Sequence, residues 1–188
     1  MTAKVAKSIH EALLAVGSNM GDRLAYLQAA LDALSSAPGI DVRRVSRVYE
    51  TVPFGGPPES SDFLDLSAQP LFLNAVARIE TDLSPQLLLV QVQAVETALD
   101  RVRTSRWSAR TIDVDIIVYD GIEQNDPLLT LPHPRAHERE FVLRPWLDIE
   151  PDAVMPGRGP VEQLLKELAA SDVVARPDHL LNWHNASK

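Results

Sequence analysis

The sequence predicts an α+β fold of the ferredoxin-like, split βαβ type, with an antiparallel sheet that carries helices on one face. Two observations predict it. The expected elements follow one another in the order β-α-β-β-α-β, and each of the two long helices carries a single apolar stripe. Further helices are expected after the last strand, as C-terminal additions. Because helices would cover one face of the sheet, we expect the opposite face to be free for a ligand.

The first two elements are a strand and a helix. Residues 11–16 form a short apolar run, typical of a buried strand, and the Gly-Ser-Asn sequence at 17–19 is expected to be a turn. Asp22 is a suitable N-cap for the helix that follows, and Pro-Gly at 38–39 ends it. The apolar stripe of this helix comprises Leu24, Leu27, Leu31 and Leu34.

A second strand is expected over residues 41–51, and a Pro- and Gly-rich sequence at 53–58 interrupts it. The segment 55–71 is long for a loop, so it is either functional or a disordered insertion. Its apolar residues, Phe63, Leu64 and Leu66, are unusual for a spacer. We expect them to fold over the ligand site or onto a neighbouring helix once ligands are bound.

The third strand, residues 71–80, alternates between two faces, with Leu73 and Ala75 on the buried side and Phe72 and Asn74 on the other. Ser-Pro at 84–85 is a typical helix start. The core stripe of this second helix comprises Leu88, Val92, Val95 and Leu99. The remaining expected elements are a strand over 111–119 and helices over 137–147 and 160–170, with little pattern from residue 171 onwards.

Composition narrows the function classes. The chain of 188 residues is expected to be one domain, 1–188, with 1–10 and 171–188 flexible or peripheral. A net charge of −8 argues against general nucleic-acid binding, and the absence of cysteine excludes disulfide and thiolate chemistry. Neither an apolar run of the roughly 20 residues that span a membrane nor the apolar core of a signal peptide is found. We therefore expect a cytoplasmic monomer whose partners are small molecules, not nucleic acid or membrane.

The strongest candidates for catalytic and ligand-binding residues lie in one segment, 101–119, where four arginines and a tryptophan precede Asp113 and Asp115. The two aspartates alternate with apolar residues, so their carboxylates share one face with Cα atoms roughly 6.6 Å apart. Two such anions need a cation or a raised pKa, and a pair of Mg²⁺ ions fits between them. Arginines hold phosphate oxygens in a forked geometry. The segment indicates phosphoryl-type transfer from a nucleotide; the alternative is a solvated strand face beside an exposed loop.

Several motifs, taken together, resemble the 6-hydroxymethyl-7,8-dihydropterin pyrophosphokinase family. They are Gly-Ser-Asn at 17–19, Tyr-Glu-Thr at 49–51, Phe-Leu-Asn-Ala at 72–75, Arg-Val-Arg at 101–103 followed by Arg-Trp at 106–107, Arg-Thr-Ile-Asp-Val-Asp at 110–115 and the sequence from Pro132 to Phe141. The resemblance extends from about residue 13 to 151. It implies an enzyme of folate biosynthesis that moves the pyrophosphoryl group of ATP, the co-substrate, onto the pterin hydroxymethyl and releases AMP.

The resemblance also implies roles for individual residues. Asp113 and Asp115 correspond to the ligands of two Mg²⁺ ions, and Arg101 and Arg110 to catalytic phosphate-binding arginines. The pterin would be held by Thr51, Phe54, Phe72, Asn74 and Phe141, of which Phe72 and Phe141 stack on its two faces. The ATP side would comprise Gln93, Glu96, Arg103, Trp107, Ile116, Thr130, His133 and Arg139. Without the resemblance, Gln93 and Glu96 are ordinary helix-surface residues.

Three departures from the family pattern concern the loops and the first aromatic residue. The family usually has Trp-Gly-Pro-Arg where this chain has Trp-Ser-Ala-Arg at 107–110, often has Tyr at the position of Phe72, and has a shorter loop than 55–71. A second hypothesis is a non-catalytic ferredoxin-like module that binds a nucleotide or RNA. RNA binding favours a basic face with exposed aromatic residues. The acidic net charge and the aspartate pair argue against it.

Overall fold

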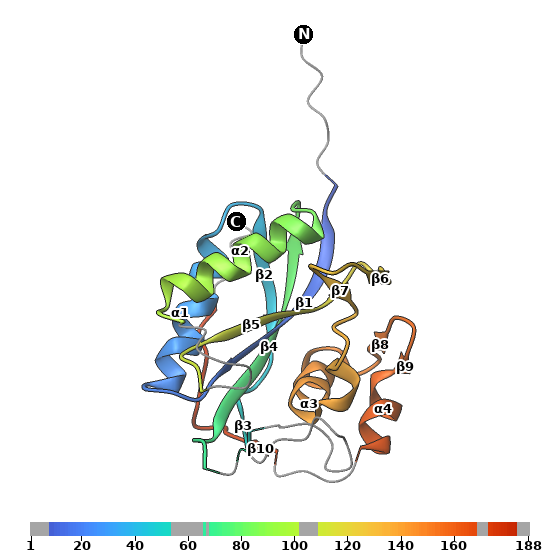
Figure 1. The fold of residues 1–188 in the computed structure, drawn as a ribbon. Coiled ribbons are helices and arrows are strands. Elements are labelled where there is room, and N and C mark those ends of the chain that lie inside the picture. Colours follow the sequence, from blue (N-terminus) through green and yellow to red (C-terminus); the bar gives the residue numbers. More distant parts are fainter. Residues whose placement is uncertain (1–7, 54–65, 67, 102–108, 169–172, 184–188) are drawn as a thin grey trace.

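The computed structural model describes residues 8–53, 66, 68–101, 109–168 and 173–183 (Figure 1). Its main sheet has six strands in the order β10-β3-β4-β1-β5, with β2 also paired to β4. The pairings are antiparallel. The strands of this sheet and the two helices between them are β1 (His10–Ser18), α1 (Arg23–Ser36), β2 (Ile40–Val45), β3 (Tyr49–Thr51), β4 (Phe72–Thr81), α2 (Pro85–Ala98), β5 (Asp113–Tyr119) and β10 (Val174–Ala175). This arrangement confirms the split βαβ prediction.

Helices α1 and α2 pack on one face of the sheet, over the larger hydrophobic core. Asp22 accepts a hydrogen bond from the backbone N–H of Ala25 (3.1 Å), and Ser84 accepts one from that of Leu87 (3.3 Å). Both caps confirm the predicted helix starts. The buried residues of the two predicted stripes are Leu27, Leu31, Leu34, Leu88, Val92 and Val95.

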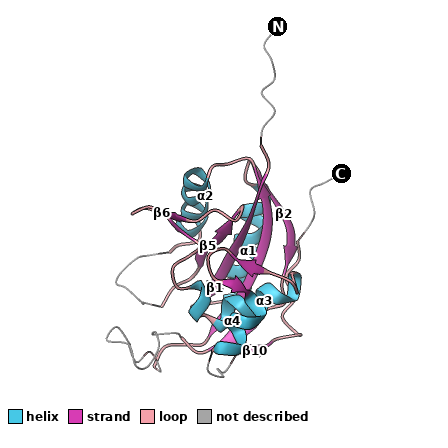
Figure 2. Ribbon diagram, turned by 90° about the vertical axis from the view of Figure 1, so that its right-hand side faces the viewer, coloured by secondary structure: helices cyan, strands magenta, loops and turns pink. Residues whose placement is uncertain are grey.

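The sequence led us to expect that the opposite face of the sheet would be free. It is only partly free, because the C-terminal helices cover part of it. A second core joins strand residues such as Leu13 and Val76 to Val142 and Trp146 of α3 (Glu140–Ile149). Figure 2 shows α3 and α4 (Val161–Glu167) in front of the sheet, with α1 behind it. The remaining elements are the hairpins β6 (Gln124–Asn125) with β7 (Thr130–Leu131) and β8 (Val154–Met155) with β9 (Gly159–Pro160).

The predicted helix over 137–147 is divided in the structure. A 3₁₀ helix (Ala136–Glu138) precedes α3, and between them Arg139 has an extended backbone, with φ −113° and ψ 97°. The single apolar periodicity of this segment thus did not indicate that the helix is interrupted at Arg139. This break turns Arg139 and Phe141 towards the sheet, where both line a pocket.

The predicted strand over 41–51 is likewise two strands. Val45 of β2 pairs with Ala77 of β4, whereas Tyr49 of β3 pairs with Asn74, so three residues lie opposite two. This extra residue has the character of a β-bulge, which bends a strand. Ser46 stabilises the bend, because its hydroxyl oxygen accepts a hydrogen bond from the Val76 backbone N–H (3.0 Å).

The first strand extends further than its apolar run. Gly17 and Ser18, predicted to lie in a turn, are the last residues of β1, and Gly17 pairs with Asn74 on one side and Asp113 on the other. A Cβ atom at position 17 would lie only 2.7 Å from the Asn74 side-chain oxygen. Glycine is therefore required by close packing within a central strand and not by a turn.

The segment 173–183, where the sequence shows little pattern, pairs with the sheet and packs along α1. Val174 and Ala175 form β10 and pair with Glu50 and Tyr49 of β3. Leu181 and Trp183 pack against the larger core. These contacts join residues that are far apart in the sequence, so a local sequence pattern cannot predict them.

A two-pronged ion pair between Arg78 and Glu150 joins β4 to the end of α3, with Nε and Oε1 2.5 Å apart. Burial raises the pKa of the Glu150 carboxyl, but hydrogen bonds from Arg78 and Trp146 outweigh burial and lower it. Since the pKa is depressed on folding, this pair stabilises the protein above the unfolded-state pKa of about 4.3 and loses its effect as pH falls through the folded-state pKa.

We therefore expect Glu150→Gln to lower the free energy of unfolding by about 2 kcal/mol at pH 7 and by much less at pH 3. Urea denaturation of both proteins at several pH values measures this difference. Glu162→Gln, which alters an exposed pair with Lys166, is the matched control and should change stability by less than about 0.5 kcal/mol. A deficit for Glu150→Gln that did not shrink at low pH would show that packing, not charge, makes the contribution.

Candidate active site

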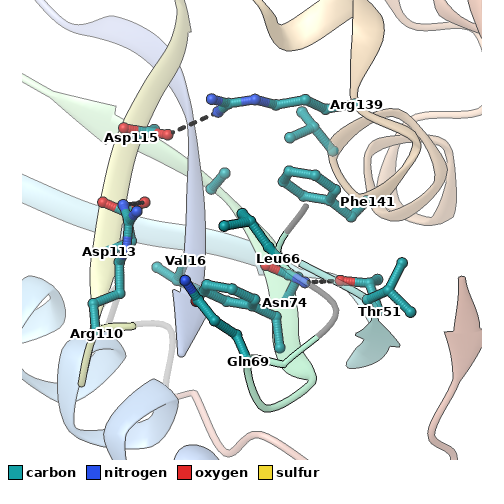
Figure 3. Close-up of a pocket in the computed structure, with 15 residues that line it drawn as sticks. Val16, Thr51, Leu66, Gln69, Asn74, Arg110, Asp113, Asp115, Arg139 and Phe141 are labelled. Carbon is teal, nitrogen blue, oxygen red and sulfur yellow. Dashed lines mark hydrogen bonds and ion pairs between the residues drawn. The ribbon is translucent and has the colours of Figure 1, made fainter. Parts of the chain in front are cut away.

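A pocket lies on the sheet face beside the first turn of α3, where the ends of β1, β3, β4 and β5 meet (Figure 3). Four strands, the loop before β4 and the α3 region all contribute to its wall. Its lining residues are Ala15, Val16, Gly17, Thr51, Val52, Leu66, Gln69, Phe72, Asn74, Arg110, Asp113, Asp115, Arg139, Phe141 and Val142. Acidic, basic and aromatic side chains that are far apart in the sequence are thereby brought together.

Asp113 and Asp115 project from β5 into this pocket, while Val114 and Ile116 face the helix-covered core. The predicted sharing of one face by the two carboxylates is thus confirmed. In the neighbouring strand, Asp113 lies opposite Gly17 and Asp115 lies opposite Ala15. Small residues at these positions leave space above the sheet beside both carboxylates.

Two arginines hold the Asp113 carboxylate. Arg101 Nη1 lies 2.7 Å from Oδ1, and Arg110 Nη1 lies 2.6 Å from Oδ2. Burial, and then the charge of Asp115, raise the pKa of Asp113, and the charges of Arg110, Arg101 and Arg139 oppose this rise. The ionised Asp113 carboxylate is therefore destabilised by burial and by the nearby charge of Asp115, and the surrounding cations stabilise it.

Glu96, on α2, positions Arg101. It is buried on α2, with 3% of its surface exposed. Its carboxylate accepts a hydrogen bond from the Val114 backbone N–H (2.9 Å) and forms an ion pair with Arg101. Glu96 thus ties α2 to β5 and orients the Arg101 guanidinium towards Asp113.

Asp115 has a different set of neighbours. Arg139 Nη1 donates a hydrogen bond to its Oδ2 (3.1 Å), and Nε2 of His133 lies 3.8 Å from the same oxygen. Burial and the charges of Arg139 and Arg135 lower the pKa of His133 to about 4. Because the Arg135 backbone N–H donates to Nδ1 of His133 (3.2 Å), the neutral imidazole carries its proton on Nε2, facing Asp115.

Aromatic and amide side chains line the other end of the pocket. Phe72 comes from β4 and Phe141 from α3, and the guanidinium of Arg139 lies 5.7 Å from the centre of the Phe141 ring. The Asn74 side chain donates a hydrogen bond to the Thr51 hydroxyl (2.8 Å) and is buried. The Thr51–Asn74 pair and Phe141 face the same space in Figure 3.

Other predicted residues lie away from this pocket or outside the described residues. The Gln93 side chain is exposed on α2, and that of Ile116 is buried in the larger core and does not line the pocket. Thr130 and His133 line a second groove, between β7 and the β8–β9 hairpin. Phe54, Arg103 and Trp107 lie outside the described residues, as do Phe63 and Leu64, whereas Leu66 lines the pocket.

Residues 13–151 match the model of the 7,8-dihydro-6-hydroxymethylpterin-pyrophosphokinase (HPPK) family. The chain belongs to this family. The resemblance carried by the sequence motifs is thereby confirmed.

Individual relatives agree with the family match. The chain is 41% identical over 155 residues to the 2-amino-4-hydroxy-6-hydroxymethyldihydropteridine pyrophosphokinase of Methylorubrum extorquens, covering 82% of this chain and 92% of that protein. It is 38% identical over 158 residues to the enzyme of the same name from Haemophilus influenzae, covering 84% of this chain and 92% of the relative.

Solved structures support the fold. A crystal structure of a Plasmodium falciparum HPPK-DHPS variant superposes with a TM-score of 0.65 at 15% sequence identity. The match covers 87% of this chain but only 46% of the Plasmodium chain. This similarity shows that the described fold is that of the HPPK structures, and at such low identity it shows the fold alone.

Asn19, which does not line the pocket itself, joins two segments of the pocket wall, a role that the sequence did not reveal. Its Oδ1 accepts a hydrogen bond from the Arg110 backbone N–H (2.8 Å), and its Nδ2 donates to Gln69 Oε1 (3.2 Å) and to the Pro70 carbonyl (3.3 Å). Asn19 is 1% exposed and so needs such partners. The Gly-Ser-Asn motif of the family was the available signal, but it resembles an ordinary turn.

The donor set of this pocket suits Mg²⁺ bound together with phosphates. The described residues contain no group of three or more His, Cys, Asp or Glu side chains arranged to hold a metal by themselves. Mg²⁺, however, is commonly held by one or two carboxylates, with phosphate oxygens and waters as its other ligands. Asp113 and Asp115 on one strand face provide such a carboxylate pair.

Proposed function

We propose that this protein transfers the pyrophosphoryl group of ATP to the hydroxymethyl oxygen of 6-hydroxymethyl-7,8-dihydropterin, releasing AMP, in folate biosynthesis. One observation supports this most strongly: a single pocket is lined by an aspartate pair, two arginines able to bind phosphate, and two phenylalanines. The names of the relatives, which the chain covers almost completely, support the same substrate class.

Asp113 and Asp115 would hold two Mg²⁺ ions in this proposal, since both carboxylates face the pocket. When bound, Mg²⁺ supplies neutralisation of phosphate charge and a lower pKa for the attacking hydroxyl. The strand itself orients the two carboxylates before any ligand arrives, because β5 is paired along β1.

Arg101, Arg110 and Arg139 would bind the phosphate oxygens. In the structure they pair with the two carboxylates, and a guanidinium that reaches these carboxylates also reaches anionic phosphates placed beside them. Phosphoryl-type transfer depends mainly on positioning and charge stabilisation. These arginines would offset the charge that develops on the bridging oxygen as AMP leaves.

The pterin would lie at the aromatic end of the pocket, stacked between Phe72 and Phe141. Asn74 uses its N–H to bond Thr51, which leaves the amide oxygen directed to accept a hydrogen bond from the pterin edge. Phe54 would complete this set, and Gln93, Glu96, Arg103, Trp107, Ile116, Thr130 and His133 would complete the ATP side, on the basis of the family motifs alone.

The proposal includes a single-domain, monomeric enzyme in the cytoplasm. ATP as co-substrate favours that compartment. No helix of the described residues is long and apolar enough to cross a membrane.

The deciding experiment is a coupled assay of AMP release with ATP, Mg²⁺ and 6-hydroxymethyl-7,8-dihydropterin. We expect AMP release to require all three. The 6-methyl analogue, which lacks the accepting hydroxyl, is the matched control and should give no AMP. AMP release that was equally fast with the analogue or without pterin would contradict the proposal, as would RNA binding in the absence of Mg²⁺.

Phe141→Ala tests the pterin position. We expect the Kd for pterin to rise about tenfold or more, because stacking contributes about 0.5–1.5 kcal/mol beyond buried area. The Kd for a non-hydrolysable ATP analogue should change little. Calorimetry measures both, and Leu147→Ala, in the same helix but outside the pocket lining, is the control. Equal losses for the two ligands would instead indicate that Phe141 acts only through the core.

A further inference from the structure

We propose that Arg176 is a positioning residue for the pterin end of the pocket, acting through Glu50. This inference rests on the proposed function. Arg176 lies outside residues 13–151, the part of the chain that matches the HPPK family.

The argument begins with β3, which has only three residues, Tyr49–Thr51. One side of β3 pairs with β4, so that Thr51 lies opposite Phe72 and Tyr49 lies opposite Asn74. Its other side pairs with β10, and the Arg176 backbone N–H donates to the Val48 carbonyl (2.8 Å). A strand this short needs partners on both sides to hold its position.

The charged side chains reinforce this pairing on the α1 side of the strand. Glu50 is the residue between Tyr49 and Thr51, and its side chain is 11% exposed. Its carboxylate forms an ion pair with Arg176 and accepts a hydrogen bond from Arg23 of α1 (2.9 Å). Burial raises the pKa of Glu50, but the hydrogen bonds from Arg176 and Arg23 outweigh burial and lower it. Glu50 is therefore a buried anion held between two cations.

Arg23 extends the network to the neighbouring strand. The same Nη1 that bonds Glu50 also donates to the Leu71 carbonyl (2.9 Å). Glu50 precedes Thr51, and Leu71 precedes Phe72. The network thus holds, from the helix side, the two backbone positions that present Thr51 and Phe72 to the pocket on the opposite side.

The segment that carries Arg176 is itself anchored further along α1. Gln28 donates to the Asn182 carbonyl (2.7 Å) and accepts from the Asn182 backbone N–H (2.8 Å). Trp183 packs against the larger core. Arg176 is therefore presented from a fixed segment, as positioning requires.

The test compares Arg176→Met with wild type in the full chain. Lys166→Met, which removes a cation from an exposed ion pair on α4, is the matched control. We expect Arg176→Met to raise the Kd for pterin about tenfold, with the Kd for a non-hydrolysable ATP analogue and kcat at saturating pterin within about twofold of wild type. Arg176→Lys, which keeps the charge, should recover most of the affinity, and Lys166→Met should behave as wild type.

A double-mutant cycle with Glu50→Gln identifies the partner. If Arg176 acts through Glu50, the two substitutions together should weaken pterin binding no more than the stronger one alone. Unchanged pterin affinity in folded Arg176→Met would overturn the inference, and so would equal losses for pterin and the ATP analogue, which indicate general loosening. Failure of the proposed function is distinguishable, because wild type would then release no AMP.

Discussion

Replacing Asp115 with Asn should lower kcat for AMP release by about 100- to 1,000-fold, a loss of about 3–4 kcal/mol of transition-state stabilisation. The substitution keeps the shape of the side chain but removes one anionic ligand from the carboxylate pair. The fold should survive, because the Asp115 side chain is 32% exposed and its repulsion of Asp113 disappears.

The kinetic loss is measured by AMP release at saturating ATP and pterin, and folding is checked by thermal denaturation. Asp152→Asn, at an exposed position outside the pocket lining, serves as the control and should leave both unchanged. Normal turnover by Asp115→Asn would show that the carboxylate is not a metal ligand.

Removal of Glu96 should have the largest effect on stability. Glu96→Ala leaves the Val114 N–H without its acceptor and Arg101 without its buried counter-charge, so we expect the free energy of unfolding to fall by about 3–5 kcal/mol. Glu96→Gln keeps an acceptor for Val114 and should cost less. Because it releases Arg101 from its ion pair, we expect it to lower kcat.

Urea denaturation and AMP release distinguish the two roles of Glu96. Glu167→Ala, an exposed carboxylate on α4, is the control for removal of a glutamate from a helix and should change stability by less than about 0.5 kcal/mol. If Glu96→Gln turned over ATP like wild type, the orientation of Arg101 by Glu96 would be unimportant for the reaction.

Much of the fold follows from local patterns. Alternation in β5 placed Asp113 and Asp115 on one face, and the caps Asp22 and Ser84 located both long helices. These features depend on neighbours within a few residues, which is why one sequence is enough to predict them.

The remaining features depend on partners that are distant in the sequence. Gly17 is explained by Asn74, and the burial of Asn19 by Arg110 and Gln69. Likewise, the extended backbone of Arg139 between the 3₁₀ helix and α3 interrupts a regular apolar pattern, although Ala136 and Val142 on either side of it belong to the same core. No periodicity within a window reveals such contacts.

The two-residue strand β10 also has a consequence for solubility. It occupies the outer side of β3, where unpaired backbone groups would otherwise form an open edge able to recruit strands from other chains. As a new edge, β10 is a poor template, because it is short and is followed by Arg176 and then by Pro177, which has no N–H. The chain thus ends its sheet with a strand that discourages edge-to-edge aggregation.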